Sequence, residues 1–152
     1  MPRALLDVNL LVALFDPDHV HHELAHDWFA DNRSDGWATC PLTENGLVRV
    51  LAHPKYGSPV AAIPAVLERL RAFCASRQHE FWVDEVSFRD ERIFAPALVR
   101  GHRQLTDVYL LGLAVAKGGR LATFDRSIPP RAVIGATLES LTVIGAVGEE
   151  DE

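Results

Sequence analysis

The sequence predicts an α/β sandwich with a mainly parallel central sheet. Short apolar runs alternate along the chain with longer segments whose apolar residues recur every three or four positions, the pattern of strands followed by helices. Such alternation is typical of parallel sheets, because each helix returns the chain to the start of the next strand. The chain has 152 residues, 48% of them hydrophobic, which is enough for one domain with a substantial core.

Short apolar runs predict the strands of this sheet. Runs of three or four residues between polar or turn-forming residues are typical of buried strands. The first and fourth runs are each followed at once by an aspartate, Asp7 and Asp125. The predicted strands cover residues 3–6, 37–40, 81–83, 121–124 and 141–144.

Helical spacing of apolar residues predicts the helices between these strands, and some carry clear end signals. Ser58-Pro59 form an N-cap and first-turn pair, and Thr106 can cap a helix that Gly118-Gly119 closes. Residues 98–104 show no clear pattern. The predicted helices cover residues 9–15, 18–31, 41–51, 87–94 and 107–117, and a segment that begins at Ser58-Pro59 and contains residues 63–74.

We expect a single domain over residues 1–147, followed by an acidic tail at residues 148–152. The formal charge of −6 argues at first against a nucleic-acid partner, since phosphate contacts usually come from excess Lys and Arg. Removing the four tail acids from the total of 21 leaves 17 acids against 15 Lys and Arg. The remaining surface is nearly neutral, so charge neither supports nor excludes RNA.

The sequence carries no sign of a membrane segment or a disulfide framework. No run approaches the roughly 20 apolar residues that cross a bilayer, and the apolar start lacks a small-residue cleavage site, so we expect a cytoplasmic protein. Cys40 and Cys74 stand alone, outside any metal-ligand spacing. We interpret both as small buried side chains.

Two carboxylates are predicted on apolar helix faces. Glu44 shares a face with Leu47 and Leu51, and Asp107 shares one with Leu111, because residues three, four and seven apart lie on the same side of a helix. Burying an unpaired carboxylate is costly, so each requires the adjoining helix N-terminus, a basic partner or a cation.

Asp7 and Asp125 follow predicted strands, at the edge where parallel sheets bind ligands. Asp7, Glu44, Asp107 and Asp125 can therefore meet at one edge although they lie far apart in the sequence. A divalent cation would relieve their mutual repulsion, and oxygen ligands favour Mg²⁺ or Mn²⁺ over zinc. Singly, each acid has an ordinary explanation as a first-turn or turn residue. The set of four indicates a metal site.

Four segments of the sequence resemble those of a known family. The segments LLDVNLLVAL, PLTENGLVRVL, QLTDVYLLGLAVAKGGRLATFD and LTVIG resemble those of a PIN domain, in particular a VapC-type toxin of a bacterial VapBC toxin–antitoxin pair. The likeness spans nearly the whole chain, and the order and spacing of the segments are more specific than any one of them. The resemblance implies a PIN-like three-layer α/β/α sandwich.

The resemblance also implies an activity. The acidic quartet of the family corresponds here to Asp7, Glu44, Asp107 and Asp125, with Asn9 and Thr123 at neighbouring polar positions. It implies an endoribonuclease that uses Mg²⁺ or Mn²⁺ to activate a water for attack on RNA phosphodiesters. The implied partners are an RNA substrate, a cognate VapB-type antitoxin whose tail fills the site, and a second copy of the chain in a homodimer.

Two other functions compete with this one. The first is a catalytically silent PIN-like module that binds RNA or an antitoxin, against which the presence of all four acids argues. The second is a receiver-type phosphoacceptor domain. That domain needs paired acids after the first strand, whereas Asp7 has no acidic neighbour.

Weaker signals have simpler explanations. His22 and His26 have the i, i+4 spacing of a zinc pair, but a solvated helix start explains them better. Trp28, Phe29 and Trp82 fall on apolar stripes and are interpreted as core or dimer contacts rather than stacking platforms for bases. Basic residues that flank the acidic segments are candidates for RNA phosphate contacts, namely Arg49, Arg100, His102, Arg103, Arg126 and Arg131.

Overall fold

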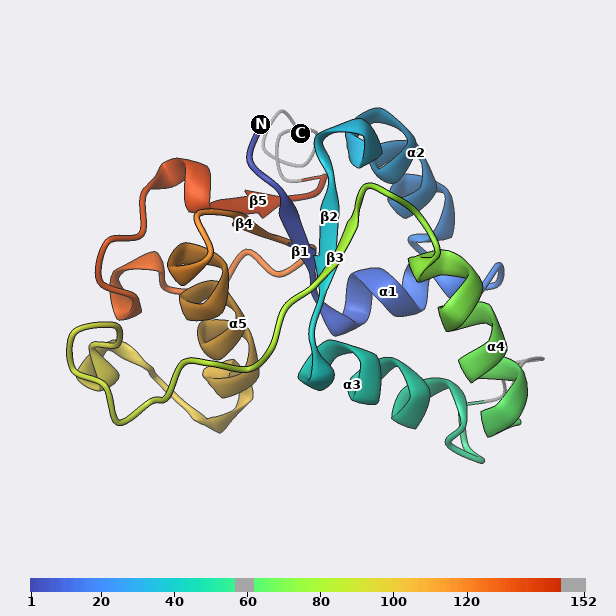
Figure 1. Ribbon diagram of the computed structural model, residues 1–152. Coiled ribbons are helices and arrows are strands. Elements are labelled where there is room, and N and C mark those ends of the chain that lie inside the picture. Colours follow the sequence, from blue (N-terminus) through green and yellow to red (C-terminus); the bar gives the residue numbers. More distant parts are fainter. Residues whose placement is uncertain (57–61, 146–152) are drawn as a thin grey trace.

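The computed structural model (Figure 1) describes residues 1–56 and 62–145, and in these residues the strands form one parallel sheet. The order across the sheet is β3-β2-β1-β4-β5, and every neighbouring pair is parallel. The strands are β1 (Ala4–Leu6), β2 (Trp37–Thr39), β3 (His79–Phe81), β4 (Arg120–Thr123) and β5 (Leu141–Val143).

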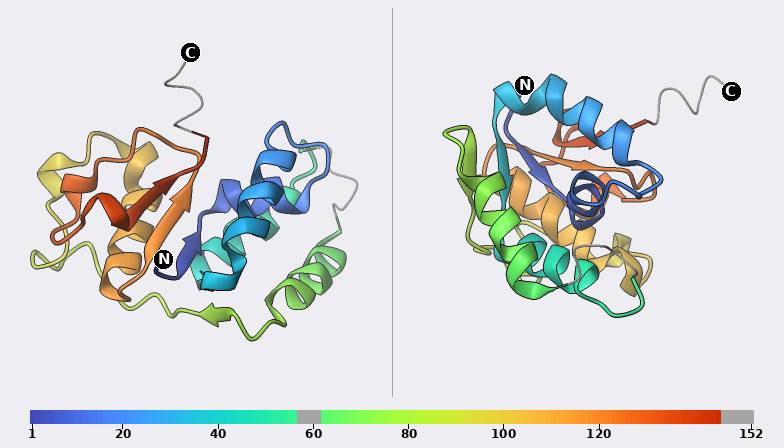
Figure 2. Two further views of the ribbon diagram at one scale, coloured as in Figure 1. Left: turned by 90° about the horizontal axis from the view of Figure 1, so that it is seen from above. Right: turned by 90° about the vertical axis from the view of Figure 1, so that its right-hand side faces the viewer.

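Helices cover both faces of the sheet and make three layers. One core cluster joins one face of the sheet to the first four helices, and a second joins the other face to the last helix and its neighbouring loops. Figure 2 shows this division from two further directions. The helices are α1 (Val8–Phe15), α2 (His22–Asn32), α3 (Pro41–Leu51), α4 (Ile63–Cys74) and α5 (Leu105–Ala116).

The side chains of β1 show why its sequence is continuously apolar. Ala4 and Leu6 lie in the core on the α1 side, whereas Leu5 lies in the core on the α5 side. Successive strand residues point to opposite faces, so a strand with helices on both faces is buried at every position. The α/β/α sandwich predicted from the sequence is confirmed.

The order of the strands locates the edge that the acids share. The chain passes from β1 to β2 and β3 on one side and then returns to place β4 and β5 on the other side of β1. The reversal between β1 and β4 is a topological switch point, where a crevice opens beyond the carboxyl ends of the strands. Asp7 follows β1 and Asp125 follows β4 by two residues.

One predicted helix is wrong. Residues 87–94 form turns, and Phe94 makes an isolated antiparallel bridge with Val133. The carboxylate of Asp90 accepts a hydrogen bond from the backbone N–H of Arg92 at 2.9 Å. Such local hydrogen bonds from side chains engage backbone groups that a helix would otherwise use. The apolar spacing of this segment therefore predicted a helix that does not form.

Element boundaries differ from the predictions where tertiary contacts decide them. The third strand lies two residues earlier than 81–83, because its register with β2 pairs Trp37 with His79. The helix expected from Asp18 begins at His22, after a turn in which Asp16 accepts from the Asp18 N–H at 3.0 Å.

Of the residues predicted to begin or end helices, some do so in the structure and others do not. Thr106 lies inside the first turn of α5 and is not its cap. Gly118 has φ +70°, as the predicted end of that helix requires. The Ser58-Pro59 start and the acidic tail at 148–152 lie outside the described residues. No helix among the described residues is long and apolar enough to span a membrane.

A substitution at Gly119 tests the packing that positions β4. A Cβ there would lie 2.6 Å from the carbonyl oxygen of Arg3 and 2.7 Å from the ring of Trp82. The Arg3 carbonyl already accepts the Arg120 N–H at 2.9 Å, so it cannot move away without disturbing the pairing of β1 with β4. We expect Gly119→Ala to lower the free energy of unfolding by about 1–3 kcal/mol in urea titrations.

The matched control is Gly101→Ala, because no atom lies within 4 Å of the position that its Cβ would take. Equal stabilities of the two variants would contradict this account of the strand packing.

Candidate active site

Asp7 is a buried carboxylate at the junction of three elements. It directly follows β1 and caps α1, where its Oδ1 accepts the backbone N–H of Leu10 at 2.8 Å. Its Oδ2 accepts the hydroxyl of Thr123, the last residue of β4. The residue is 2% exposed. These contacts hold the carboxylate in one orientation beside the switch point.

Asp125 is held beside Asp7 through the same threonine. Its backbone N–H donates to Thr123 Oγ1 at 3.0 Å, so this hydroxyl joins the two aspartates. The Asp125 Oδ1 accepts the backbone N–H and the hydroxyl of Ser127, at 2.8 and 2.7 Å. The turn after β4 therefore orients the second carboxylate.

Asp107 completes a cluster of like charges. It lies half-buried in the first turn of α5, on the opposite layer from α1. Burial, and then repulsion by Asp125, raises the pKa of Asp107 to about 6. Burial raises the pKa of Asp7 to about 7, against its two hydrogen bonds and with further repulsion from Asp107 and Asp125. The three carboxylates therefore act on one another electrostatically.

This donor set fits a hard divalent cation. Burial and like charges raise the pKa values of Asp7 and Asp107, so both carboxylates are unfavourable in their charged form at this site. A buried carboxylate without a countercharge is unfavourable, and a cation among the oxygens would offset both the desolvation and the repulsion. Carboxylate oxygens from separate elements are the ligands that Mg²⁺ and Mn²⁺ prefer.

The structure orients Glu44, the fourth predicted acid, differently. Its Oε2 accepts the hydroxyl of Thr39 at 2.7 Å, and the same hydroxyl lies 2.8 Å from Nε2 of His79. Ligating atoms of Glu44, Cys74 and His79 all lie within 4.8 Å of one another. Glu44 thus lies on the first turn of α3 but turns its carboxylate toward α4 and β3.

The sequence analysis did not single out Thr39 or His79 and read Cys74 only as a buried side chain. A single threonine or histidine at a strand end carries no distinctive spacing, so no local signal could have identified this group. Only the pairing of β2 with β3 and the packing of α4 bring these residues to Glu44.

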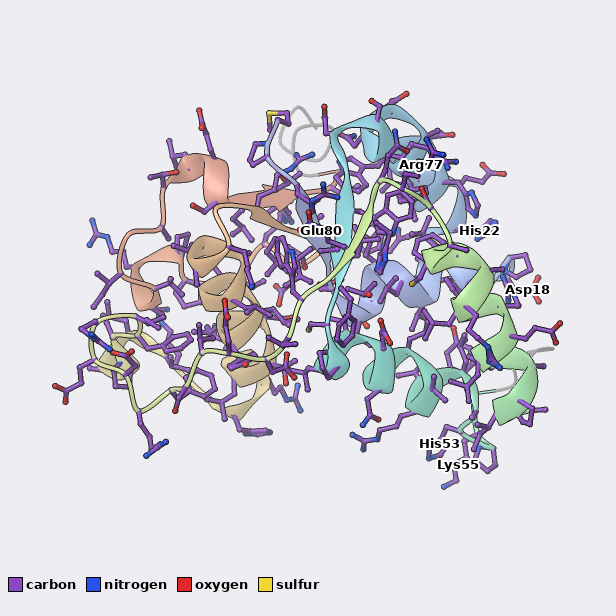
Figure 3. The ribbon with its side chains drawn as sticks, viewed as in Figure 1. Asp18, His22, His53, Lys55, Arg77 and Glu80 are labelled. Carbon is purple, nitrogen blue, oxygen red and sulfur yellow. The ribbon has the colours of Figure 1, made fainter. Side chains whose placement is uncertain are left out.

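The other side of α3 lines a cavity of about 610 Å³ next to the aspartates. Val8 and Thr106, the chain neighbours of Asp7 and Asp107, both line it. Its basic lining residues are Arg49, His53 and Lys55. Figure 3 shows His53 and Lys55 together beyond the end of α3.

The remaining basic candidates are distributed over other surfaces. Arg100 and Arg131 line a separate cavity of about 720 Å³, and His102 and Arg103 are exposed on the turn before α5. Two predicted basic residues lie close to the aspartates: Arg126 directly follows Asp125, and Arg49 lines the cavity that reaches Val8 and Thr106. Lys55 and His53 were not predicted, because they lie in a turn with no acidic motif beside it.

The histidine pair of α2 has a structural role. His22 Nδ1 lies 2.7 Å from the carbonyl oxygen of Ala13, and His26 Nε2 lies 3.1 Å from that of Leu14. Each imidazole therefore uses one ring nitrogen for a contact that links α2 to the end of α1. Both rings contact the backbone of α1, whereas the sequence analysis expected a solvated helix start.

The aromatic residues pack as the sequence analysis expected. Trp28 and Phe29 pack against the core on the α1 side, and Trp82 is buried in the core on the α5 side.

Comparison with known proteins places this chain in a family. A family model for the PIN domain matches residues 4–132, a range that includes all four acids. Ribonuclease VapC44 of Mycobacterium tuberculosis is 46% identical over 142 residues, which cover 93% of this chain and 99% of that protein. Ribonuclease VapC38 of the same organism is 46% identical over 125 residues, which cover 82% and 86%.

Solved structures share the fold. The crystal structure of Mycobacterium tuberculosis VapC20, described as a sarcin-ricin loop cleaving toxin, matches with a TM-score of 0.59 and 14% identity over 82% of this chain and 92% of that one. The structure of VapBC2 from Rickettsia felis, bound to a DNA fragment from their promoter, matches with a TM-score of 0.54 and 15% identity, covering 83% and 92%. At these identities the likeness concerns the fold alone.

The raised pKa values predict how stability depends on pH without metal. Asp7 and Asp107 titrate at about 7 and 6 in the folded state, above the value of about 3.9 for an unfolded chain. The folded state therefore holds more protons than the unfolded state between about pH 4 and 7. Protonation of the two carboxyl groups therefore stabilises the folded state at low pH, and this stabilisation is lost as the pH rises through the window.

We expect the Tm in EDTA to fall between pH 5 and pH 8. Asp7 has the larger of the two pKa shifts, so Asp7→Asn should reduce this fall in Tm. It should also raise the free energy of unfolding at pH 8 by at most about 4 kcal/mol. Asp27→Asn, on the exposed surface of α2, is the control and should leave the profile unchanged. A wild-type slope in Asp7→Asn would contradict the assignment to Asp7.

Proposed function

The chain belongs to the PIN domain family, among its VapC-type members, and on this premise we propose that it is a metal-dependent endoribonuclease, the toxin of a type II toxin–antitoxin pair. The observation that carries the proposal is the cluster of Asp7, Asp107 and Asp125 at the switch point. Burial, together with repulsion among these carboxylates, raises the pKa values of Asp7 and Asp107. Relatives that are 46% identical carry the name ribonuclease.

Asp7, Asp107 and Asp125 would hold Mg²⁺ or Mn²⁺ in this cluster. A cation bound there would supply positive charge at the scissile phosphate and would make a water more acidic. Thr123 positions the ligands, because its hydroxyl donates to Asp7 and accepts from the backbone N–H of Asp125. The reaction requires no side-chain nucleophile.

Glu44 is proposed as the fourth acid of the site. It lies in the first turn of α3, which follows β2 at the same edge of the sheet. Its carboxylate is bonded to Thr39, so this role requires the side chain to rotate away from that hydroxyl. The three aspartates would therefore provide most of the cation binding, and Glu44 would have an auxiliary role.

The cavity beside the aspartates is proposed to take the RNA backbone. Arg49 and Lys55 line it together with His53, and the cavity reaches Val8 and Thr106 next to the acids. Phosphate contacts position a nucleic acid without reading its bases, and basic side chains provide most of them. A strand lying along this cavity would bring a phosphodiester to the cluster.

The partners of the chain are part of the same proposal. The Rickettsia felis structure contains a VapBC pair on promoter DNA, and it supports a VapB-type antitoxin as the cognate partner here. We further propose a homodimer and a cytoplasmic location. The dimer is testable by light scattering at low protein concentration, where a strict monomer would refute it.

Substitution of the aspartates tests the ribonuclease proposal directly. We expect the purified protein to cleave structured RNA with Mg²⁺ or Mn²⁺ and to stop in EDTA. Asp7→Asn and Asp107→Asn should each lower the cleavage rate by roughly 100-fold or more, since each removes a charged ligand while keeping the side-chain shape. The measurement is the rate of RNA cleavage on gels, with circular dichroism as a check on folding.

Asp27→Asn is the control for this experiment and should cleave like the wild type. Undiminished cleavage by Asp7→Asn in a nuclease-free preparation would overturn the site assignment. A wild-type protein that binds RNA without cutting it under any divalent metal would instead support the silent module.

The basic cavity predicts a separable effect on RNA binding. Arg49→Ala should weaken RNA binding. It should also reduce the slope of log affinity against log salt concentration by about one, because a protein with one phosphate contact fewer releases about one counterion fewer on binding. The rate at saturating RNA should change little. Fluorescence anisotropy with labelled RNA at several salt concentrations measures this.

Arg77→Ala is the matched control, since Arg77 is exposed and lies far from Lys55 in the structure (Figure 3). Equal affinities and salt slopes of the Arg49 and Arg77 variants would show that RNA does not follow this cavity.

A further inference from the structure

We propose that Glu44, Cys74 and His79 form a binding site for Zn²⁺ that competes with the aspartate cluster for the Glu44 carboxylate. The three residues come from the first turn of α3, the last residue of α4 and the first residue of β3. One ligating atom from each lies within 4.8 Å of the other two. Side chains far apart in sequence therefore converge on one point.

The chemistry of the donors selects the cation. A thiolate, an imidazole and a carboxylate are ligands of zinc, whereas Mg²⁺ requires oxygen ligands. Zinc bonds of about 2.0–2.3 Å in tetrahedral geometry place ligand atoms roughly 3.5 Å apart. Small side-chain rotations would bring the three donors to that spacing. Three protein ligands leave the fourth position for a water.

Thr39 already holds two of the donors in place. Its buried hydroxyl donates to Glu44 Oε2 at 2.7 Å and lies 2.8 Å from His79 Nε2. The hydroxyl thus holds the carboxylate and the imidazole side by side, and a bound cation would replace its hydrogen bonds to them. Such positioning reduces the cost of ordering the ligands on binding.

The surroundings of the site are compatible with a bound cation. The three residues are half-buried, and burial lowers the pKa of His79, which keeps its imidazole in the neutral form that binds metals. Burial and the Glu44 charge raise the pKa of the Cys74 thiol, so zinc binding must release its proton to solvent. Once zinc binds, its charge stabilises the thiolate and the carboxylate together.

The site would act on the fold and on Glu44. Zinc would link α3, α4 and the edge strand β3, and it would keep Glu44 turned away from the aspartates. Cys40 takes no part, because it is fully buried in the core on the α5 side.

Binding of zinc to the full-length protein tests the proposal without RNA, so the result is independent of the ribonuclease proposal. Isothermal titration calorimetry should find one Zn²⁺ per wild-type chain at this site. Cys74→Ser and His79→Gln should each weaken zinc binding by about tenfold or more, while their affinity for Mg²⁺ stays unchanged. His102→Gln, an exposed histidine, is the matched control and should bind zinc like the wild type.

Two spectroscopic and chemical readouts identify the ligands. Co²⁺ in place of zinc should show thiolate-to-cobalt charge-transfer absorption in the wild type and in His102→Gln, but not in Cys74→Ser. Zinc should slow alkylation of Cys74 by iodoacetamide, and Mg²⁺ should not. Circular dichroism checks that the variants are folded.

The proposal is overturned if folded wild type and Cys74→Ser bind zinc equally, or if the cobalt spectrum lacks the charge-transfer band. Zinc affinity that is lost only in Asp7→Asn would also overturn it, because it would place the ion in the aspartate cluster.

Discussion

The burial of the Asp7 carboxylate is the constraint on which the rest of this site depends. Burial raises its pKa to about 7 although it accepts two hydrogen bonds, so these bonds orient the charge without fully compensating its desolvation. Asp107 and Asp125 add repulsion. A cation at the site would offset this desolvation and repulsion, both of which destabilise the metal-free fold when the acids are charged.

The parallel sheet supplies the geometry for this arrangement. The strand order reverses between β1 and β4, and ligands of parallel sheets typically bind beyond the strand ends at such a switch point. Asp7 and Asp125 follow these two strands, and Thr123 connects them through one hydroxyl. Asp107 approaches from the helix layer on the other face. Each acid is therefore positioned by a different element, and the core on both faces keeps those elements in place.

Helix α3 separates two polar groups of different chemistry. On one side it lines the cavity that adjoins the aspartates, and on the other its first turn carries Glu44 toward Cys74 and His79. The close approach of α3 to α1 depends on Gly46, where a Cβ would lie 2.6 Å from the Val8 side chain. The Glu44 side chain extends from this closely packed helix, and its hydrogen bond with Thr39 turns it toward Cys74 and His79.

The sequence by itself determined the fold class, most of the strands and helices, and the placement of Asp7, Asp107 and Asp125 at one edge. Apolar periodicity and the order of elements suffice for these, because parallel strands present their carboxyl ends together. The tertiary structure alone decided the register of β3, the turns at 87–94 and the direction of the Glu44 side chain. These depend on contacts between residues distant in sequence, which local patterns do not encode.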